Sequence, residues 1–446
     1  MQVTLLNAFV YLIFMFAKPV KSKILIKTQG CSHNYADSEH MAGLLQQAGY
    51  ELVTNEDDAD VVLFNTCTVK TPTENEFLRE LKKVDSTKKV IIGGCIPQAD
   101  PQRFKNFSLI GTRQLDHVVE VVEKTLEGGV VQLLQRTGKP SLLMPTVRRN
   151  SLVETIPISL GCLNTCTFCK TKLARGTLTS YPPADIIDKV RRVTAEGVRE
   201  VWLTSQDTGC YGFDIDTNAA RLLNELCKID KNFMIRFGMG NPNHFVHIAD
   251  ELIQAYTHPR VLKFLHIPVQ AGNDEILRAM KRGYTVADFV TVVEKFRSAI
   301  PDITISTDII CGFPGETDEQ FMDTVRLLEQ VRPDVVNISR FWAREGTAAF
   351  RMTGQIHGRE IKRRSRTLTD ICDQLSLDGN LRWLGWTGKI LVDEVGKNNT
   401  FIGRNFAYKQ VVVKTDKELT LGTRVNVRIT DVGIVDLKGE LVTSQE

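Results

Sequence analysis

Three cysteines lie close together in the chain, where Cys162, Cys166 and Cys169 have the spacing C-x3-C-x2-C. Three thiolates this close can bind three irons of a cubane iron–sulfur cluster and leave the fourth iron open to chelate an amino acid. Zinc is the alternative metal, but structural zinc sites usually have four ligands, often in C-x2-C pairs. Inert core cysteines are a further alternative, although the polar neighbour Asn164 and two threonines do not resemble core packing. The spacing therefore favours an iron–sulfur site.

Three further cysteines, Cys31, Cys67 and Cys95, each follow directly after an apolar run that predicts a β-strand. The carboxyl ends of parallel strands share one edge of a sheet, where open α/β sheets bind their ligands. One such cysteine would carry no information, because free cysteine is commonly buried. Three in equivalent positions predict a second cluster site, whose open iron could hold a sulfur species.

The remaining cysteines have no comparable partner in the sequence: Cys210, Cys227, Cys311 and Cys372. Cys227 and Cys372 fall on predicted helices and are expected in the core. Cys311 begins a segment with two glycines, which permit close approach of the backbone to a ligand. A plain strand-to-helix turn is the alternative there.

The elements that position the first cysteine set alternate between short apolar runs and amphipathic stretches, from Lys23 to about Gly129. Such alternation is typical of βαβ units and an α/β domain with a parallel sheet. The predicted strands are Ile24–Lys27, Val61–Phe64, Val90–Ile92 and Leu109–Gly111, and the predicted helices are Ser38–Ala48, Thr73–Val84 and Asp116–Leu126.

A second alternating series begins at Ile156 and predicts a partial (β/α) barrel, in which Cys162 follows the carboxyl end of the first strand. The predicted barrel strands are Ile156–Leu160, Val201–Thr204, Met234–Phe237, Phe264–Ile267, Ile303–Ile309 and Val335–Phe341. From about Thr387 the apolar period changes to two, which predicts a small antiparallel β-barrel. Its predicted strands are Lys389–Asp393, Tyr408–Val413 and Thr423–Ile429.

Length and composition agree with two or three soluble domains. The chain has 446 residues, of which 42% are hydrophobic and 24% charged. We divide it into an apolar segment (1–22), an α/β domain (23–135), a linker (136–152), a barrel (153–375) and a small β-barrel (376–442). The net charge of +3 is too small for a strongly basic nucleic-acid binder, so such a partner would need local basic patches. The spacing of the 10 cysteines fits reduced thiols in an intracellular protein.

The first residues are unusual, because Val3–Ala17 is almost wholly apolar and three lysines follow it. The segment lacks the features of a secretory signal and is shorter than the roughly 20 apolar residues of a spanning helix. A weak membrane anchor, a helix packed on the body and an alternative start remain open. We expect a cytoplasmic protein, because the lysines after the segment would keep the rest of the chain on the cytoplasmic side if the segment inserted.

Several segments together carry a family resemblance. They are Gln29-Gly30-Cys31-Ser32-His33-Asn34, Asn65-Thr66-Cys67-Thr68-Val69, the Cys162 loop with Phe168 before its last cysteine, Leu265-His266-Ile267-Pro268-Val269-Gln270 and Gly312-Phe313-Pro314-Gly315-Glu316. Over roughly residues 23–440 the chain resembles the methylthiotransferases, a family of radical S-adenosylmethionine (SAM) enzymes. The segments Ala174-Arg175-Gly176 and Thr204-Ser205-Gln206-Asp207-Thr208-Gly209 look like the eukaryotic and archaeal type, which modifies N6-threonylcarbamoyladenosine in tRNA.

The resemblance implies a methylthiotransferase N-terminal domain, a radical-SAM core, a C-terminal TRAM domain and two [4Fe-4S] clusters. In this family the catalytic cluster, here at Cys162, Cys166 and Cys169, cleaves SAM, and the second cluster, here at Cys31, Cys67 and Cys95, delivers sulfur. SAM itself is expected to contact residues of the last two motifs, namely Gln270, Gly312, Pro314 and Gly315. The implied partners are tRNA, SAM, an electron donor and a sulfur source.

Other functions stay open at this point. The acceptor could instead be isopentenyladenosine in tRNA or a protein aspartate, and a non-catalytic iron–sulfur RNA-binding protein is a hypothesis of a different class. A dense basic run precedes the last domain and consists of Arg359, Lys362, Arg363, Arg364 and Arg366. Phosphate contact and a solvated helix face are both consistent with it. The aromatic residues Phe401, Phe406 and Tyr408 are expected in the core of the small barrel rather than stacked on bases.

Overall fold

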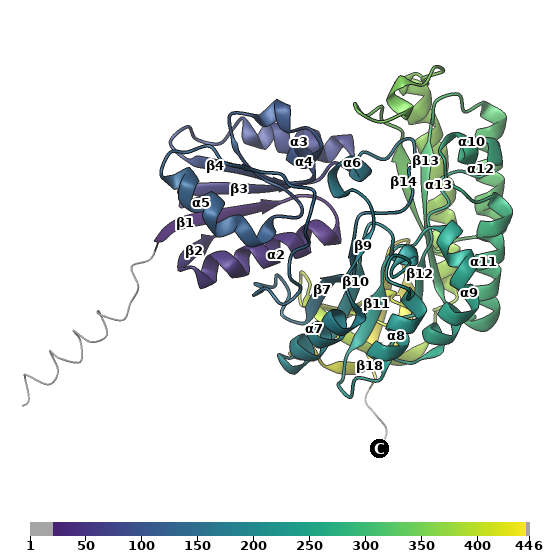
Figure 1. Ribbon diagram of the computed structural model, residues 1–446. Coiled ribbons are helices and arrows are strands. Elements are labelled where there is room, and N and C mark those ends of the chain that lie inside the picture. Colours follow the sequence, from purple (N-terminus) through teal and green to yellow (C-terminus); the bar gives the residue numbers. More distant parts are fainter. Residues whose placement is uncertain (1–20, 443–446) are drawn as a thin grey trace, which may run out of the picture. The chain divides into compact units, whose positions relative to one another are not determined.

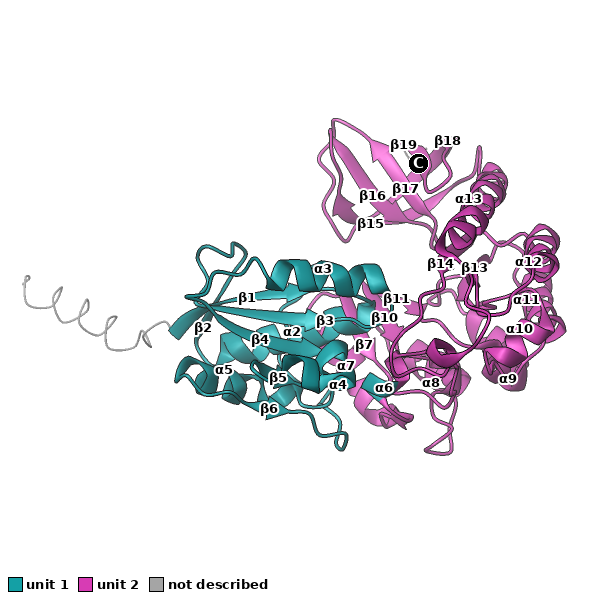
Figure 2. Ribbon diagram, turned by 90° about the horizontal axis from the view of Figure 1, so that it is seen from above, with its two compact units in different colours: residues 1–149, 173–175 teal, residues 150–172, 176–446 magenta. Residues whose placement is uncertain are grey.

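The computed structural model describes residues 21–442, which fall into two units (Figure 2). Unit 1 comprises Met1–Arg149 and Leu173–Arg175, and unit 2 comprises Asn150–Lys172 and Gly176–Glu446. The apolar segment predicted at Val3–Ala17 lies outside the described residues. Within residues 21–442, no helix combines the length and the apolar character needed to cross a bilayer.

A parallel sheet with the strand order β2-β1-β3-β4-β5-β6 forms the centre of unit 1 (Figure 1). Its strands are β1 (Lys21–Thr28), β2 (Tyr50–Val53), β3 (Val61–Thr66), β4 (Lys89–Gly94), β5 (Ser108–Ile110) and β6 (Gln132–Leu133). Its helices are α2 (Ser32–Gln47), α3 (Thr71–Leu81), α4 (Cys95–Ala99) and α5 (Val118–Leu126). The alternating sides of the strands bury two apolar clusters, one against α2 and α5 and the other against α3.

The predicted α/β domain is confirmed, with two differences. Helix α2 begins at Ser32, six positions before the predicted start at Ser38. The prediction missed its first turns because the residues buried there, such as Asn34 and Asp37, are polar and show no apolar pattern. The predicted linker has no helix or strand between residues 136 and 149, but it packs along α2. Val147 N donates to Glu39 O at 3.0 Å, and the Arg149 guanidinium lies 3.6 Å from the centre of the Tyr35 ring.

Unit 2 contains six parallel barrel strands in two groups, with the orders β11-β10-β7 and β12-β13-β14 (Figure 1). They are β7 (Val153–Pro157), β10 (Glu200–Thr204), β11 (Met234–Phe237), β12 (Phe264–His266), β13 (Thr304–Cys311) and β14 (Val335–Arg340). A parallel bridge between Ile235 and Val261 continues the arc from β11 towards β12. The outer helices include α7 (Pro183–Ala195), α8 (Ala219–Cys227), α9 (Pro242–Thr257), α11 (Val286–Ala299), α12 (Asp318–Val331) and α13 (Gly358–Leu381). The predicted partial barrel is confirmed.

The end of unit 2 is a closed five-stranded barrel with the order β15-β16-β17-β19-β18. Its strands are β15 (Thr387–Val395), β16 (Thr400–Arg404), β17 (Gln410–Lys414), β18 (Arg424–Val432) and β19 (Leu437–Leu441). The pairing of β17 with β19 is parallel and the other pairings are antiparallel, which the period of two could not show. The expected domain boundary at 375/376 falls inside α13, which runs on to Leu381.

Two aromatic residues of the small barrel have different packing partners: Phe406 packs on the small barrel's own core, whereas Tyr408 packs on the (β/α) barrel. Phe406 contacts the rings of Trp383 and Trp386, and Tyr408 contacts those of Trp202 and Phe264. The expected core position is confirmed for Phe406, whereas Tyr408 lies outside that core and joins the two barrels of unit 2.

Candidate metal centres

Unit 1 brings the three strand-end cysteines together. Cys31 directly precedes α2, Cys67 follows β3, and Cys95 begins α4 after β4. Strands β1, β3 and β4 are neighbours in the sheet, so these positions meet at its carboxyl edge. A hydrogen bond with Cys67 lowers the pKa of Cys31 to about 6, and Cys95 interacts electrostatically with Cys67. The predicted convergence of the three thiols is confirmed.

One side-chain oxygen lies between two of these thiols. Asn34 Oδ1 accepts hydrogen bonds from Cys31 Sγ at 3.4 Å and from Cys95 Sγ at 4.0 Å. Asn34 is fully buried, and its Nδ2 donates to Thr66 O at 2.8 Å, which fixes the orientation of the amide. Sequence reasoning missed its role because the start of α2 was placed after it. The motif that carries Cys31 also contains Asn34, and this was the available signal.

Because Gly30 has no side chain, Cys67 can pack directly against its backbone. The Gly30 φ of +123° is in the region that favours glycine, and an added Cβ would lie 2.4 Å from Cys67 Cβ and 2.9 Å from Cys67 Sγ. A larger residue would therefore displace Cys67 from the other two cysteines.

A buried ion pair borders the same thiols. Arg175 Nη2 donates to Asp37 Oδ2 at 2.6 Å and to Asn34 Oδ1 at 3.4 Å, and the side chains of the ion pair are only 2% and 4% exposed. Burial raises the pKa of Cys95, and the positive charge of Arg175 opposes that rise. Burial, followed by the charge of Arg175, holds the pKa of His33 well below its usual value, so this imidazole is neutral.

In unit 2, the C-x3-C-x2-C loop connects β8 (Ser159–Leu160) to α6 (Thr171–Arg175), a short helix whose last three residues belong to unit 1. The loop follows β7, the first strand of the barrel, as predicted. Its backbone is fixed on both sides, because Gly161 N donates to Gln206 Oε1 at 2.7 Å and Thr167 N donates to Met280 O at 3.1 Å. The three cysteines of this loop are partly buried.

A buried cation contacts one of these thiols directly. Arg282 Nη1 donates to Cys166 Sγ at 3.1 Å, and its Nε donates to the Tyr284 hydroxyl at 3.0 Å. Burial raises the pKa of Cys169 to about 11, and the neighbouring Cys166 contributes in the same direction. Burial thus disfavours the thiolate form of Cys169, and a bound metal would favour it.

Besides the other cysteines of its loop, Cys162 has two neighbours that the sequence analysis did not identify, Asp207 and Cys210. One ligand atom each from Cys162, Asp207 and Cys210 lie within 4.8 Å of one another. The hydrogen bond with Cys210 lowers the pKa of Cys162. The sequence pattern gave no comparable partner for Cys210, whereas the structure places it beside Cys162. Asp207 and Cys210 both follow strand β10, so the strand-end argument used for Cys31 would have found them.

Asp207 is already saturated by other donors. Its Oδ1 accepts from Gly209 N at 3.1 Å and from Asn241 N at 3.0 Å, and its Oδ2 lies 2.7 Å from His244 Nδ1. Asp207 thus organises the strand ends beside Cys162, and its oxygens are poorly available to a metal ion. The thiols rather than the carboxylate remain as candidate ligands.

The four residues expected to contact SAM all lie at the carboxyl ends of barrel strands. Gln270 has a φ of +75°, and its backbone pairs with β13. Gly312 N donates to Glu316 Oε2 at 2.7 Å and Gly315 N donates to Gly354 O at 2.9 Å, so both amides are used within unit 2. Pro314 lies buried between them. Contact of these residues with SAM stays a prediction. Any contact through Gly312 or Gly315 would not use the backbone N–H group, which already donates within unit 2.

The basic run lies on α13 and is not uniform. Arg359, Lys362, Arg363 and Arg366 are exposed. Arg364 is buried and donates to Glu316 Oε2 at 2.8 Å and to Glu360 Oε1 at 2.8 Å. Arg364 is therefore a structural residue that holds the loop after β13, and it is not available to a phosphate.

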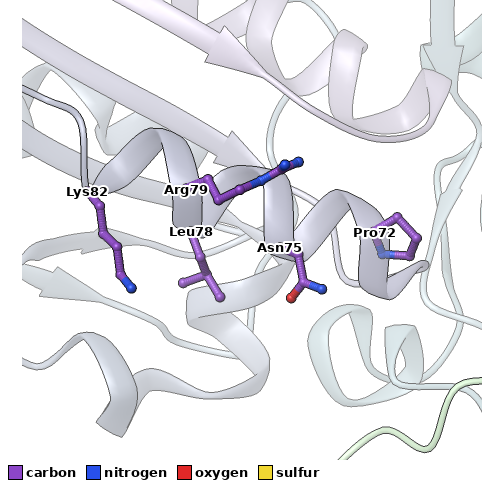
Figure 3. A pocket seen from close by; sticks show the side chains of 5 residues that line it. All are labelled: Pro72, Asn75, Leu78, Arg79 and Lys82. Carbon is purple, nitrogen blue, oxygen red and sulfur yellow. The ribbon is translucent and has the colours of Figure 1, made fainter.

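Unit 1 also has a surface hollow along α3 (Figure 3). It is lined by Pro72, Asn75, Leu78, Arg79 and Lys82. These lining residues include two cations but no thiol, so the hollow is not part of either cysteine site.

Comparison with known proteins places the three regions in known families. Residues 23–111 match the Uncharacterized protein family UPF0004, residues 156–328 the Radical SAM superfamily, and residues 384–442 the TRAM domain. The human protein named threonylcarbamoyladenosine tRNA methylthiotransferase is 43% identical over 95% of this chain and 75% of its own length. The chain belongs to the threonylcarbamoyladenosine tRNA methylthiotransferase family.

Members of the family from distant organisms show similar identity. The Drosophila melanogaster relative is 42% identical over 96% of this chain and 79% of its own length. The probable threonylcarbamoyladenosine tRNA methylthiotransferase of Pyrococcus horikoshii is 39% identical over 94% of this chain and 100% of its own length. Among solved structures, the radical S-adenosylmethionine methyltransferase TsrM of Kitasatospora setae matches with a TM-score of 0.52. At 16% identity, covering 72% of this chain and 75% of that one, this match supports the fold alone.

Proposed function

We propose that this chain is a tRNA methylthiotransferase that converts N6-threonylcarbamoyladenosine, 3′ of the anticodon, into its 2-methylthio derivative. The observation that carries the proposal is the presence of one three-cysteine site in each unit of a chain 43% identical to a human protein named for this activity. Methylthiolation of an adenine needs both a radical and a source of sulfur, because its C2–H is neither acidic nor electrophilic. Two separate sites match these two requirements.

The residues present fit two [4Fe-4S] clusters. Cys31, Cys67 and Cys95 would hold one, since they meet beside a glycine and a buried guanidinium. Cys162, Cys166 and Cys169 would hold the other, which is the catalytic one, since Arg282 already donates to one of these sulfurs. When bound, the cluster at Cys162, Cys166 and Cys169 supplies the electron that cleaves SAM, and the cluster at Cys31, Cys67 and Cys95 supplies sulfur.

The chain itself fixes the strand ends around the Cys162 loop. Arg282 donates to Cys166 and is itself buried together with Tyr284, which fixes its position beside the loop. Asp207 joins the ends of β10 and β11 through its hydrogen bonds with Asn241 and His244. A rim of hydrogen-bonded strand ends of this kind orients a bound substrate.

The partners follow from the same proposal. The TRAM domain and the relatives' name support tRNA as the substrate, and the exposed cations of α13 provide a surface that could contact its phosphates. An electron donor and a sulfur source are further required partners. We place the enzyme in the cytoplasm, where its thiols stay reduced. The cytosolic face of the endoplasmic reticulum, with weak membrane association through residues 1–22, is the alternative location.

The test is mass spectrometry of tRNA nucleosides after anaerobic reaction of the purified protein with SAM, a reductant and tRNA. Substrate tRNA should be supplied in two forms, one with threonylcarbamoyladenosine and one with isopentenyladenosine. We expect the 2-methylthio product from the first form alone, together with 5′-deoxyadenosine. The variant with Cys162, Cys166 and Cys169 replaced by alanine should form neither product, because its radical site is removed.

Each alternative predicts a different result. A product from the isopentenyladenosine form alone would assign the other tRNA substrate. Deoxyadenosine without any modified nucleoside, followed by methylthiolation of an added ribosomal protein, would assign the aspartate acceptor. A folded protein with both clusters that makes no 5′-deoxyadenosine would be a non-catalytic iron–sulfur RNA-binding protein.

A further inference from the structure

A buried arginine from the segment after the Cys162 loop lies beside the other cysteine set. Arg175 follows Cys169 by six positions, yet Leu173–Arg175 belongs to unit 1. Its guanidinium and the thiols of Cys31 and Cys95 all contact the same oxygen, Asn34 Oδ1. This arrangement puts a permanent positive charge at the edge of a three-thiol site.

The position of this side chain is fixed by its own backbone. Each of the three carbonyls in the segment accepts a side-chain hydrogen bond from unit 1. Arg136 donates to Leu173 O at 2.6 Å, Thr112 donates to Ala174 O at 3.2 Å, and Arg113 donates to Arg175 O at 3.4 Å. The backbone at Arg175 should therefore stay in place when its side chain is changed.

One end of the guanidinium lacks an acceptor. Nη2 is used by Asp37 and Asn34, whereas Nη1 is buried and has no hydrogen-bond partner among residues 21–442. A buried donor of this kind is rare in folded proteins, because losing its contact with water is unfavourable unless another acceptor replaces it. A sulfur anion is an acceptor of suitable charge, and the thiols lie next to this group.

The charges of the site lead to the same conclusion. With a cluster bound, three thiolates and Asp37 bring four negative charges to the site, and Arg175 is the cation in contact with Asp37. Asp37 accepts from Nη2 at 2.6 Å, and Nη1 is left without an acceptor among the described residues. An iron–sulfur cluster on three thiolates is itself anionic, and adding an electron makes it more so. A nearby cation stabilises the reduced state most.

We propose that Arg175 is a positioning residue of the iron–sulfur site at Cys31, Cys67 and Cys95, where its free Nη1 donates to cluster sulfur and its charge favours the reduced state. This inference rests on the proposed function, which assigns a cluster to these cysteines. Asp37 holds the guanidinium in place and partly offsets its charge. The two members of the ion pair should therefore shift the reduction potential in opposite directions.

The experiment measures that potential without the other cluster. In the full-length protein, Cys162, Cys166 and Cys169 are replaced by alanine, so that iron binds at the first site alone, and the reduced cluster is followed by electron paramagnetic resonance in a redox titration. Changing Arg175→Gln should lower the ratio of reduced to oxidised cluster at a fixed potential by about tenfold, or about 59 mV for one electron. Changing Asp37→Asn should raise it.

Two controls separate charge from structure. Arg79→Gln removes the same charge from the exposed surface of α3, where water and salt screen it, and should leave the potential unchanged. Arg175→Lys keeps the charge but offers fewer donors, and its potential should lie between those of the parent and Arg175→Gln. Iron content and circular dichroism are recorded for each variant.

The outcomes distinguish this inference from the function on which it rests. If the alanine background binds no iron while it remains folded, the first site holds no cluster and both proposals fail. If it binds iron but Arg175→Gln and Asp37→Asn shift the potential in the same direction, or not at all, Arg175 is merely structural and this inference alone is overturned. Should Arg175→Gln fail to fold, the results for Arg175→Lys and Asp37→Asn decide the question.

Discussion

Replacing Arg364 by alanine should destabilise unit 2 strongly, whereas the same change at its neighbour Arg363 should not. Arg364 is 5% exposed and its guanidinium contacts three carboxylates, those of Glu316, Asp318 and Glu360. Arg363 pairs with two of the same acidic residues but is 56% exposed. Two adjacent arginines on one helix thus differ mainly in burial.

The magnitude follows from the group that the change leaves behind. The Glu316 side chain is 1% exposed, and without Arg364 its carboxylate keeps the hydrogen bond from Gly312 N at 2.7 Å. Removing one partner of a buried ion pair usually costs about 3–5 kcal/mol, because the remaining charge is uncompensated. With a urea dependence of about 2–3 kcal/mol per molar, the unfolding midpoint should fall by roughly 1–2 M. Exposed pairs such as that of Arg363 contribute little.

Tryptophan fluorescence is a suitable probe, because all four tryptophans lie in unit 2, at positions 202, 342, 383 and 386. Burial raises the pKa of Glu316, and removing Arg364 should raise it further. A carboxyl group whose pKa is raised by folding costs stability as pH increases through that pKa, so the difference between variant and parent should shrink from pH 7.5 to pH 5.5. Equal urea midpoints for the Arg363 and Arg364 variants at pH 7.5 would refute the reasoning.

Three further predictions concern the cysteine sites and tRNA. Gly30→Ala should remove roughly half of the bound iron, since each proposed cluster carries half; Gly49→Ala, which also has positive φ but open space around its Cβ, should keep all of it. Chemical analysis of iron decides between these results. Changing exposed Lys362 and Arg366 to glutamine should reduce the slope of log K for tRNA against log salt by about 0.7–0.9 per lost contact, and an unchanged slope in filter binding would exclude this surface. Cys210→Ala should retain both clusters in the same analysis, because three thiolates suffice at each site; loss of one cluster would make Cys210 a ligand.

Much of the fold could be predicted because it depends on local patterns. The strand predicted at Met234–Phe237 agrees with β11 at both ends, and each of the other predicted strands overlaps an observed one. Apolar runs of this length are buried on both faces of a parallel sheet, so their pattern is strong. Strands β2 and β6 were missed because they are short edge strands whose residues are partly exposed.

The sequence by itself was enough to identify the six cysteines as candidate cluster ligands, since their spacing and their positions after predicted strands can be read from the order of residues. The convergence of Cys31, Cys67 and Cys95 needed one further rule, that parallel strands end at the same edge. The tertiary structure alone decided which cations and carboxylates face the thiols. Arg282 lies 116 positions from Cys166, and Arg175 lies 138 positions from Asp37. Contacts over such separations depend on how distant segments pack, and no local periodicity records them. For the same reason, Arg364 looked like part of a basic surface until the structure showed it buried against Glu316.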